Sequence, residues 1–469
     1  MLSDPEQYAW FPEIIADDAG NVYAIWAAGY SENNIAHDLL MMRVQRQGAW
    51  LPANDILAPG AGGYAVRASP ALDRQGVLHL AYRHPGIIRH TRALASIAET
   101  AASWSEPLAV NAGQDGYYPE IAVSDPNTIH VVWTAMVPTA GTPYPGEPCR
   151  NCSDIFYRQS VDGGETWSTR INLSNTLTGS VRPQLRLSPD GELFVVWEEG
   201  RDTYVGPGKA TTSLVSVSHD GGQSWSQPRE LGAPGVIAQQ PTIGFDANGA
   251  AIVVWRSLSD EVYFQRSTDG GTSWSDALVI PGIAARDWND TPFDHLHMAR
   301  DSAGHLHLVT VGQAATQSGL GVWRLEWDGE RWLAPDLISG NENYPEWPYI
   351  AVGQGNQLHV VWFERDAADR FRSGEAGVVY HVWYSTRSVD APVQVGPAPP
   401  TPTATPLPVT PTPTIRPTLR PLNLEPLERT GATATQPNLD ANATTLLLVS
   451  GVPTIFLAAV VWTLRRWRR

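Results

Sequence analysis

The chain has 469 residues, of which 42% are hydrophobic and 17% are charged, and its formal net charge is −16 at pH 7. Four of its positive charges are arginines among the last five residues, so the rest of the chain is still more acidic. This balance argues against a nucleic-acid-binding protein, because such proteins present a basic patch to the phosphates. It leaves room for local basic pockets on an acidic surface.

A repeat begins about ten residues from Met1 and runs along most of the chain. Each copy has Pro, then Ile or Leu two residues later, a turn with Asp or Gly, and an apolar run that ends in Trp or Tyr. Six clear copies start at Pro12, Pro70, Pro119, Pro183, Pro241 and Pro348, and a weaker copy covers residues 294–310. Period-2 apolar runs between Gly, Asp and Pro predict strands. Further short runs complete four strands per copy, the pattern of a propeller blade.

Three similar nonapeptides lie inside the middle copies: SVDGGETWS at 160–168, SHDGGQSWS at 218–226 and STDGGTSWS at 267–275. The Asp side chain can accept hydrogen bonds from backbone N–H groups of its own turn. The Gly pair permits positive φ where the chain reverses, and the Trp can pack beneath the turn as an apolar plug. Each nonapeptide is therefore predicted to be the tip of a β-hairpin.

The shared pattern, Ser-x-Asp-Gly-Gly-x-x-Trp-Ser, resembles the Asp-box, or BNR repeat, of the sialidase-like β-propeller family. In that family the Asp-boxes lie away from the ligand site, so the resemblance implies a structural role for them. The matching positions are Ser160, Asp162, Gly164, Trp167, Ser218, Asp220, Gly222, Trp225, Ser267, Asp269, Gly271 and Trp274.

The repeats predict an all-β fold for residues 1–395, a single β-propeller of four-stranded blades. Counting the weak copy gives seven blades, which we favour, and omitting it gives six, the number in known sialidases. Residues 392–395 are expected to form the fourth strand of the last blade. The ring would then close without an N-terminal strand.

The C-terminal part has a different composition. Residues 396–444 are rich in Pro and Thr and predict a disordered, extended stalk. Residues 445–464 carry no charge and are long enough for a transmembrane helix. The basic tail, 465–469, would remain in the cytoplasm and leave the propeller outside the cell membrane. The opening MLSDPEQYAW has no export signal, so the natural chain is expected to start further upstream.

The only cysteines, Cys149 and Cys152, are predicted to form a local disulfide in an exported protein, because two cysteines alone make a poor zinc site. No phosphate loop, Ser-His-Asp signature or HExxH motif is present, so no cofactor or metal is predicted. The alternating pairs His295/His297 and His305/His307 are expected at outward strand positions.

The family resemblance places the ligand site on the face opposite the Asp-boxes, among the loops that enter strand one or join strands two and three. An exo-sialidase needs arginines that clamp a carboxylate, a Tyr–Glu nucleophile and an acid. The candidate catalytic residues in these loops are Arg67, Arg182, Arg201, Arg256, Arg365, Asp202, Glu198, Tyr118 and Tyr344. The candidate ligand-binding residues are Tyr117, Glu120, Trp288, Asp290, Glu346 and Trp347.

The family's Arg-Ile-Pro opening motif is missing, and the nearest matches are Arg182-Pro183 and Arg67-Ala68-Ser69-Pro70. Three functions therefore stay open. The first is a membrane-anchored propeller that recognises glycans or glycoconjugates at the cell surface. The second is an active exo-α-sialidase or related glycoside hydrolase, and the third is a non-catalytic propeller that binds a protein partner.

Overall fold

The computed structural model describes residues 1–32, 35–56, 66–84, 86–111, 116–136, 152–176, 178–200, 211–287, 294–314, 319–340, 343–370 and 378–396. Within these ranges the chain forms strands and three short 3₁₀ turns, Ala95–Ile97, Ala101–Ser103 and Ala367–Asp369. The predicted all-β fold is confirmed. None of the helical turns in these ranges is long and apolar enough to cross a membrane. The predicted membrane span and basic tail lie outside the described residues.

The first two sheets are antiparallel meanders. The first has the order β1-β2-β3-β4, with β5 also paired to β3, and the second has the order β6-β7-β8-β9. The strands of the first sheet are β1 Tyr8–Ala16, β2 Val22–Glu32, β3 Ile35–Arg46, β4 Ala49–Trp50 and β5 Asn54–Asp55. Those of the second are β6 Val66–Leu72, β7 Val77–Arg83, β8 Ile88–Leu94 and β9 Leu108–Ala109.

The next two sheets repeat this meander with four strands each, in the orders β10-β11-β12-β13 and β14-β15-β16-β17. The third sheet contains β10 Gly116–Asp125, β11 Thr128–Met136, β12 Ser153–Ser160 and β13 Ile171–Asn172. The fourth contains β14 Ser180–Leu187, β15 Leu193–Glu199, β16 Thr212–Ser218 and β17 Arg229–Leu231. In both sheets the predicted repeat Pro lies in the first strand.

The fifth sheet has eight strands and includes the weak repeat copy. Strands β18-β19-β20-β21 form one meander, and β21 pairs onward with β23, which also pairs with β22 and β24. Its strands are β18 Gln239–Phe245, β19 Ala251–Arg256, β20 Glu261–Ser267, β21 Leu278–Ala285, β22 His297–Arg300, β23 Leu306–Ala314, β24 Gly321–Trp327 and β25 Asp336–Leu337. The weak copy is thus a set of strands joined edge to edge to the copy before it.

The last sheet has three strands, β26 Tyr344–Gly353, β27 Gln357–Arg365 and β28 His381–Ser388. The expected fourth strand at 392–395 is wrong, because this segment forms no strand. Instead, Gln394 N donates to Gln354 O, and the following Gly396 N donates to Asp18 O. The N-terminal segment lies beside β28, because Leu2 N donates to Val382 O over 2.7 Å. The chain's beginning, rather than its end, therefore covers the outer edge of the last sheet.

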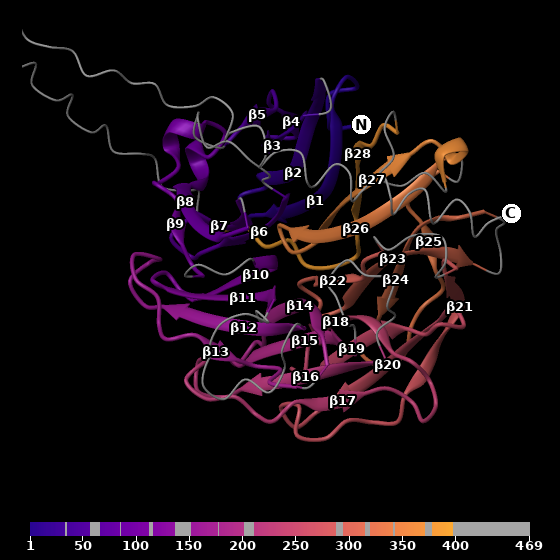
Figure 1. Cartoon of the computed structure of the whole chain (residues 1–469). Helices are drawn as coiled ribbons and strands as arrows, with labels where there is room; N and C mark the ends of the chain where they lie inside the picture. Colours follow the sequence, from indigo (N-terminus) through magenta and orange to yellow (C-terminus); the bar gives the residue numbers. More distant parts are fainter. Residues whose placement is uncertain are drawn as a thin grey trace, which may run out of the picture. The chain divides into compact units, whose positions relative to one another are not determined.

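The first strands of the sheets form a closed ring. β1 contacts β6, and the contacts continue through β10, β14, β18, β22 and β26, which contacts β1 again. Figure 1 shows these strands around a common centre, with β5, β9, β13 and β17 on the outside. Residues 1–404 form one compact unit. This arrangement of radial antiparallel sheets is a β-propeller, as the repeats predict.

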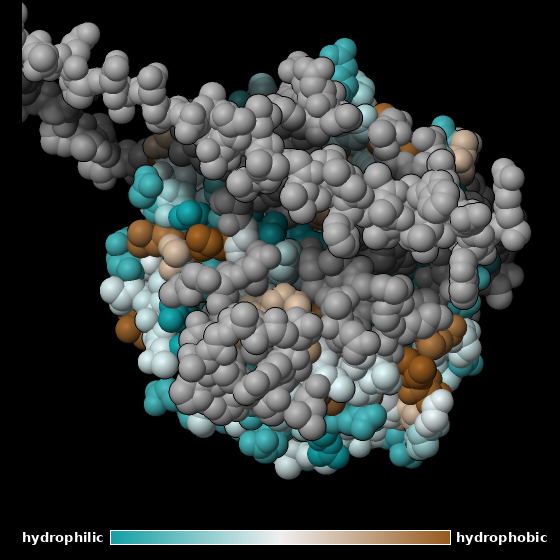
Figure 2. Space-filling model, viewed as in Figure 1, coloured by the Kyte–Doolittle hydropathy of each residue, from teal (hydrophilic) through white to brown (hydrophobic). Residues whose placement is uncertain are grey.

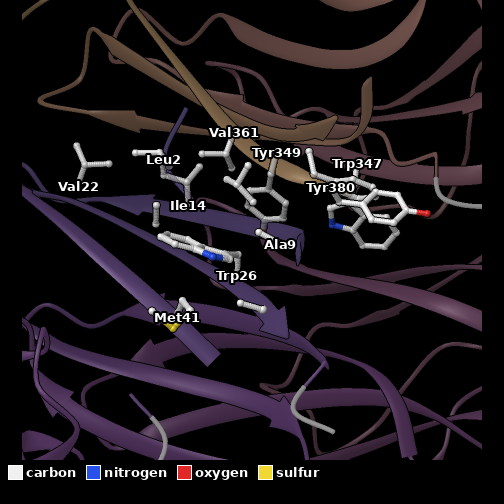
Figure 3. Packing of buried hydrophobic residues seen from close by; sticks show 14 of the residues in the cluster. Leu2, Ala9, Ile14, Val22, Trp26, Met41, Trp347, Tyr349, Val361 and Tyr380 are labelled. Atoms are coloured by element: carbon white, nitrogen blue, oxygen red, sulfur yellow. The ribbon is translucent and has the colours of Figure 1, made fainter. Parts of the chain in front are cut away.

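The core lies between neighbouring sheets and includes a buried Trp from four of the second strands, β2, β11, β15 and β19. Trp26, Trp133, Trp197 and Trp255 are at most 1% exposed. Burial of one such side chain stabilises the fold by about 5 kcal/mol from its area alone. Figure 3 shows the junction between the first and last sheets, where Trp26 and Ile14 lie near Val361 and other apolar side chains.

The three Asp-box turns share one set of hydrogen bonds. In the second box, Ser218 Oγ donates to Asp220 Oδ1 over 2.8 Å, Gly222 N donates to Ser218 Oγ over 2.8 Å, and Ser224 N donates to Asp220 Oδ1 over 2.9 Å. Equivalent bonds recur in the boxes at 160–168 and 267–275. Hydrogen bonds donated mainly by the Ser224 side chain lower the pKa of Asp220 to about 2.

The second glycine of each Asp-box rests on the preceding sheet. A Cβ added at Gly222 would lie 1.7 Å from Tyr157 Oη, and one at Gly164 would lie 2.2 Å from His90 Nδ1. Gly271 makes the same kind of approach to Val217. Each box therefore joins its own sheet to the third strand of its neighbour.

Candidate functional site

A repeated irregularity in the first strands shapes the centre of the ring. In six of them the pairing with the second strand shifts register, which is the mark of a β-bulge. A non-glycine residue with φ between 51° and 60° lies at each shift: Phe11, Arg67, Tyr118, Arg182, Gln240 and Trp347. In five of the six the next residue is proline, which has no N–H to donate to the ladder. A bulge re-aims the side chain it carries.

Five of these six side chains surround one cavity, which we call the axial pocket. Arg67, Tyr118, Arg182, Gln240 and Trp347 line it, together with Glu13, Glu120, Gln184, Asp294, His295 and three prolines. Its volume among the described residues is about 30 Å³. This is room for roughly one water molecule, so only a small group of a larger ligand could enter it.

Arg67 lies among aromatic rings. Its guanidinium carbon is 3.9 Å from the centroid of Tyr118, 4.1 Å from that of Phe11 and 4.9 Å from that of Trp347. Each ring faces the cation at a distance typical of a cation–π interaction. All four side chains come from different sheets, so the ring of bulges builds this cage.

Arg182 is the second cation of the axial pocket. It hydrogen bonds to Tyr118, and its Nη1 lies 3.8 Å from Oε1 of the buried Glu198. Glu198 is fixed in turn, because its Oε1 accepts a 3.0 Å hydrogen bond from Gln240 N. Arg182, Tyr118 and Glu198 therefore form a connected group at one side of the pocket.

Asp294 connects the axial pocket to a second group of arginines. Its carboxylate accepts from Arg256 Nη1 at 3.3 Å and from Arg286 through Nε at 3.2 Å and through Nη2. Arg256 also pairs with Asp260 at 2.7 Å. Two guanidinium groups thus share one buried carboxylate at the edge of the pocket.

Beyond Asp294 lies a group that we call the Tyr344 cluster, made of Tyr344, Glu346, Arg286 and Arg365. The guanidinium carbons of Arg286 and Arg365 lie 4.4 and 4.7 Å from the centroid of the Tyr344 ring. Arg365 Nη2 is 2.9 Å from Glu346 Oε1, and both side chains are fully buried. This cluster brings a phenol, a carboxylate and two cations together.

Below the bulges, the next inward residues form a floor of polar side chains, the floor cluster: Glu13, Glu120, Arg186, His297 and Tyr349. Arg186 Nη1 donates to Glu120 Oε2 over 2.9 Å, and its Nη2 lies 2.5 Å from His297 Nε2. The ring of His297 stacks on Tyr349 with centroids 3.5 Å apart. Burial lowers the pKa of His297 well below its usual value, so the ring is neutral.

The predicted site residues fall into three groups. Arg67, Arg182, Tyr118, Glu120 and Trp347 line the axial pocket, and Glu198 contacts Arg182 beside it. Arg256, Arg365, Tyr344 and Glu346 lie off the axis in ion pairs or ring contacts, and Tyr117 packs against Arg83. The remaining four candidates, Arg201, Asp202, Trp288 and Asp290, lie outside the described residues.

Two further expectations concern cysteine and histidine. Cys152 is disulfide-bonded, and its predicted partner Cys149 lies outside the described residues. The outward placement is wrong for both histidines of the first pair: His297 is buried in the floor cluster, and His295 lines the axial pocket and stacks on Trp347 at 4.5 Å. It is also wrong for His307 of the second pair, which is fully buried beside Asp301. Within the described ranges, no group of three His, Cys, Asp or Glu side chains is arranged to hold a metal ion.

Sequence reasoning did not select Glu13, Gln240 or Arg286 as site residues. The first two carry a signal that the repeat contains, because in β1, β10, β14, β18 and β26 at least one residue directly before or after the repeat Pro lines the axial pocket. Glu13 follows Pro12, and Gln240 precedes Pro241. Arg286 follows β21 with no repeat partner and could be placed only from the structure.

The model of one protein family, described as the BNR repeat-like domain, matches residues 91–360. No curated protein matches the chain. Among solved structures, a protein of unknown function from Dyadobacter fermentans is 14% identical, with 82% of this chain and 96% of that chain covered and a TM-score of 0.49. The NanB sialidase from Streptococcus pneumoniae is 12% identical, with 83% and 70% covered and a TM-score of 0.46. The intramolecular trans-sialidase from Ruminococcus gnavus is 12% identical, with 80% and 94% covered and a TM-score of 0.44. Similarity at this level says nothing about the chemistry of the site.

Proposed function

Because the chain belongs to the BNR repeat-like domain family, we propose that it is a membrane-anchored propeller that recognises acidic glycans outside the cell. The observation that carries this proposal is the axial pocket, where Arg67 and Arg182 lie beside the rings of Tyr118 and Trp347. A guanidinium fork binds a carboxylate through two parallel hydrogen bonds. Flat aromatic side chains offer an apolar face with a polar edge, which suits a sugar ring.

The size of the pocket supports recognition of a terminal group. A cavity of about 30 Å³ is too small for a sugar ring but admits a single oxygen or part of a carboxylate. The charged end of the glycan would enter between Arg67 and Arg182, while its remainder would lie outside the pocket. Of the arginines predicted as a carboxylate clamp and described in the structure, Arg256 and Arg365 are held in ion pairs away from this point. This favours binding without hydrolysis.

A partner protein on a broad apolar face is less well supported. On the face seen in Figure 2, the described surface carries separate small hydrophobic areas among hydrophilic ones. A docking surface for a protein would present a continuous apolar patch of several hundred Å².

We further propose that the ring has seven blades, with the eight-stranded sheet counted as two. The contacts that close the ring through β18, β22 and β26 support this count. Residues 396–444 would then act as a stalk and 445–464 as the membrane anchor, with 465–469 in the cytoplasm. Fractionation of cells that express the full chain, or a version ending at residue 444, tests the anchor: only the full chain should sediment with membranes.

A glycan array probed with the full chain in detergent tests the recognition of acidic sugars. We expect carboxylate-bearing glycans to bind and their neutral counterparts not to bind. Arg182→Ala should weaken binding by about 10- to 100-fold, because it removes charge-assisted hydrogen bonds worth about 1.5–3 kcal/mol. Arg387→Ala is the matched control, since Arg387 is an exposed arginine on β28 that pairs with Asp336. Equal binding of neutral glycans would overturn the proposal.

Hydrolysis is the second candidate, and the Tyr344 cluster favours it. Tyr344 lies against two arginines, and Glu346 is on the same strand. An exo-sialidase uses a Tyr–Glu pair as nucleophile. Release of the fluorophore from a fluorogenic sialoside, lost in Tyr344→Phe, would select this function over binding alone.

A further inference from the structure

Glu13 is a buried carboxyl group at the bottom of the axial pocket. It comes from β1, two residues beyond the bulge at Phe11, and only 5% of the residue is exposed. Its side chain lines the pocket, and its Oε2 atom has no hydrogen-bond partner among the described residues. A buried polar atom without a partner is unusual in a folded protein and indicates a place for a ligand or a water molecule.

The neighbouring carboxyl group has the partner that Glu13 lacks. Glu120 accepts a 2.9 Å hydrogen bond from Arg186, which compensates its negative charge. Burial and the negative charge of Glu120 raise the pKa of Glu13 well above its usual value, although Arg186 and Arg67 act in the opposite direction. Burial also raises the pKa of Glu120, while Arg186 acts in the opposite direction. Because the guanidinium of Arg186 donates to Glu120, Glu120 is the carboxyl group that is held ionised, and Glu13 is the one that keeps its proton.

Titratable or charged groups on five neighbouring first strands lie around Glu13. They are Arg67 on β6, Glu120 on β10, Arg186 on β14, His295 and His297 at the start of β22, and Tyr349 on β26. Burial keeps both histidines and Tyr349 neutral near pH 7, because it lowers the pKa of each histidine and raises that of the tyrosine. Glu13 and Glu120 are therefore the groups of the floor cluster that can bind or release a proton near pH 7.

We propose that Glu13 is the proton donor of the axial pocket, and that its carboxylic acid donates a hydrogen bond to an oxygen of the bound acidic sugar. This inference rests on the proposed function. The neutral acid adds a donor to the pocket that Arg67 and Arg182 also line, without adding a negative charge. An ionised Glu13 would instead repel the carboxylate of the ligand. Recognition of the anionic sugar then requires one proton on the protein, and affinity falls as that proton is lost at higher pH.

The protonation of Glu13 is tested first without any ligand. Infrared spectra of the full chain at pH 7 should show a protonated carboxyl band that Glu13→Gln removes. Glu165→Gln is the control, because Glu165 is an exposed glutamate in an Asp-box. Glu120→Gln should move the titration midpoint of the band to lower pH, since it removes a neighbouring negative charge. A band that survives in Glu13→Gln, or a midpoint that Glu120→Gln leaves unchanged, overturns the inference.

The role in binding is tested with 3′-sialyllactose as probe, by calorimetry on the full chain across pH 6 to 9. Above the midpoint, Kd of the wild type should rise about tenfold per pH unit, because one proton is linked to binding. Glu13→Gln should bind with a Kd independent of pH, since its amide still donates a hydrogen bond and carries no charge. A pH dependence identical in Glu13→Gln and wild type overturns the linkage. Loss of all binding to acidic glycans would sink the proposed function, while the infrared result would still decide the state of Glu13.

Discussion

Two regions of this propeller use the same rare backbone conformation with opposite residue choices. In the Asp-boxes, the left-handed positions are glycines, such as Gly222 with φ of 90°. At the axial bulges, the left-handed positions are Phe11, Arg67, Tyr118, Arg182, Gln240 and Trp347. A non-glycine residue in this conformation costs about 1 kcal/mol or more. The chain therefore avoids this strain where only the turn is needed and accepts it where a side chain must reach the axis.

The largest expected effect is at the Asp-boxes. Gly222→Ala should lower the free energy of unfolding by about 3 kcal/mol, because it adds a Cβ both at positive φ and against Tyr157 Oη. Gly221→Ala is a matched control: Gly221 also has positive φ, but nothing lies within 4 Å of an added Cβ. That variant should lose only about 1 kcal/mol. Urea unfolding measures both, and equal losses would mean that the contact between sheets is unimportant.

At the axial bulges, replacement by Gly should destabilise the fold less than replacement by Ala, which is the reverse of the order in a regular strand. Gln240→Gly should be more stable than Gln240→Ala by about 1 kcal/mol, because Gln240 has φ of 52°. Gln265 is a control in the regular pairing of β20 with β19. There Ala should be more stable than Gly by about 0.5–1 kcal/mol. The same order at both positions, measured by urea unfolding, would contradict the idea that the bulges hold strain.

Much of the fold could be predicted from the sequence, because the same strand-forming pattern recurs in each copy of the repeat. The Pro and the apolar run that ends in Trp or Tyr recur in six clear copies, so the sheets, their order and the buried aromatic side chains follow from the pattern. The closure of the ring could not be read in this way. Leu2 pairs with β28 through a backbone hydrogen bond. Such a bond does not require particular side chains, so no sequence pattern predicts it.

The site could be predicted only in part. The repeat fixes which residues flank the Pro, and this places Tyr118, Arg182 and Trp347 at the axis. It does not show that Arg256 and Asp294 pair, because that contact joins the end of β19 to the loop before β22, which does not repeat. His297 was misplaced because alternation along a strand gives two faces without saying which one faces the axis.

A smaller effect on the free energy of unfolding should appear in mild acid, through two buried histidines beside the Asp-boxes. Burial lowers the pKa of His90 to about 3 and of His130 to about 4, and these residues contact Gly164 and Tyr157. A histidine with a lowered pKa binds its proton more tightly when unfolded, so stability is lost as pH falls below about 6.5. For each of the two histidines, the free energy of unfolding should fall by about 0.8 kcal/mol at pH 6.

Thermal unfolding between pH 7 and pH 4 checks this effect. In His90→Gln, the melting temperature should decrease less between pH 7 and pH 4 than it does in the wild type, since glutamine does not titrate. A fall of equal slope in His90→Gln and wild type would show that the acid sensitivity arises elsewhere.

The smallest effect concerns the charge of the Asp-box itself. In Asp220→Asn the amide can replace the carboxylate, because the Ser224 hydroxyl that donates to Asp220 Oδ2 can rotate and accept instead. Only the charge is then lost. Since the pKa of Asp220 is lowered to about 2 in the folded chain, its charge stabilises the fold above about pH 4, and this contribution disappears as pH falls towards 2. The difference in melting temperature between wild type and Asp220→Asn should therefore be small at pH 7 and vanish near pH 2. A difference that stays constant with pH would assign the role of Asp220 to geometry alone, and would leave the glycine contact as the feature through which the Asp-box joins two sheets.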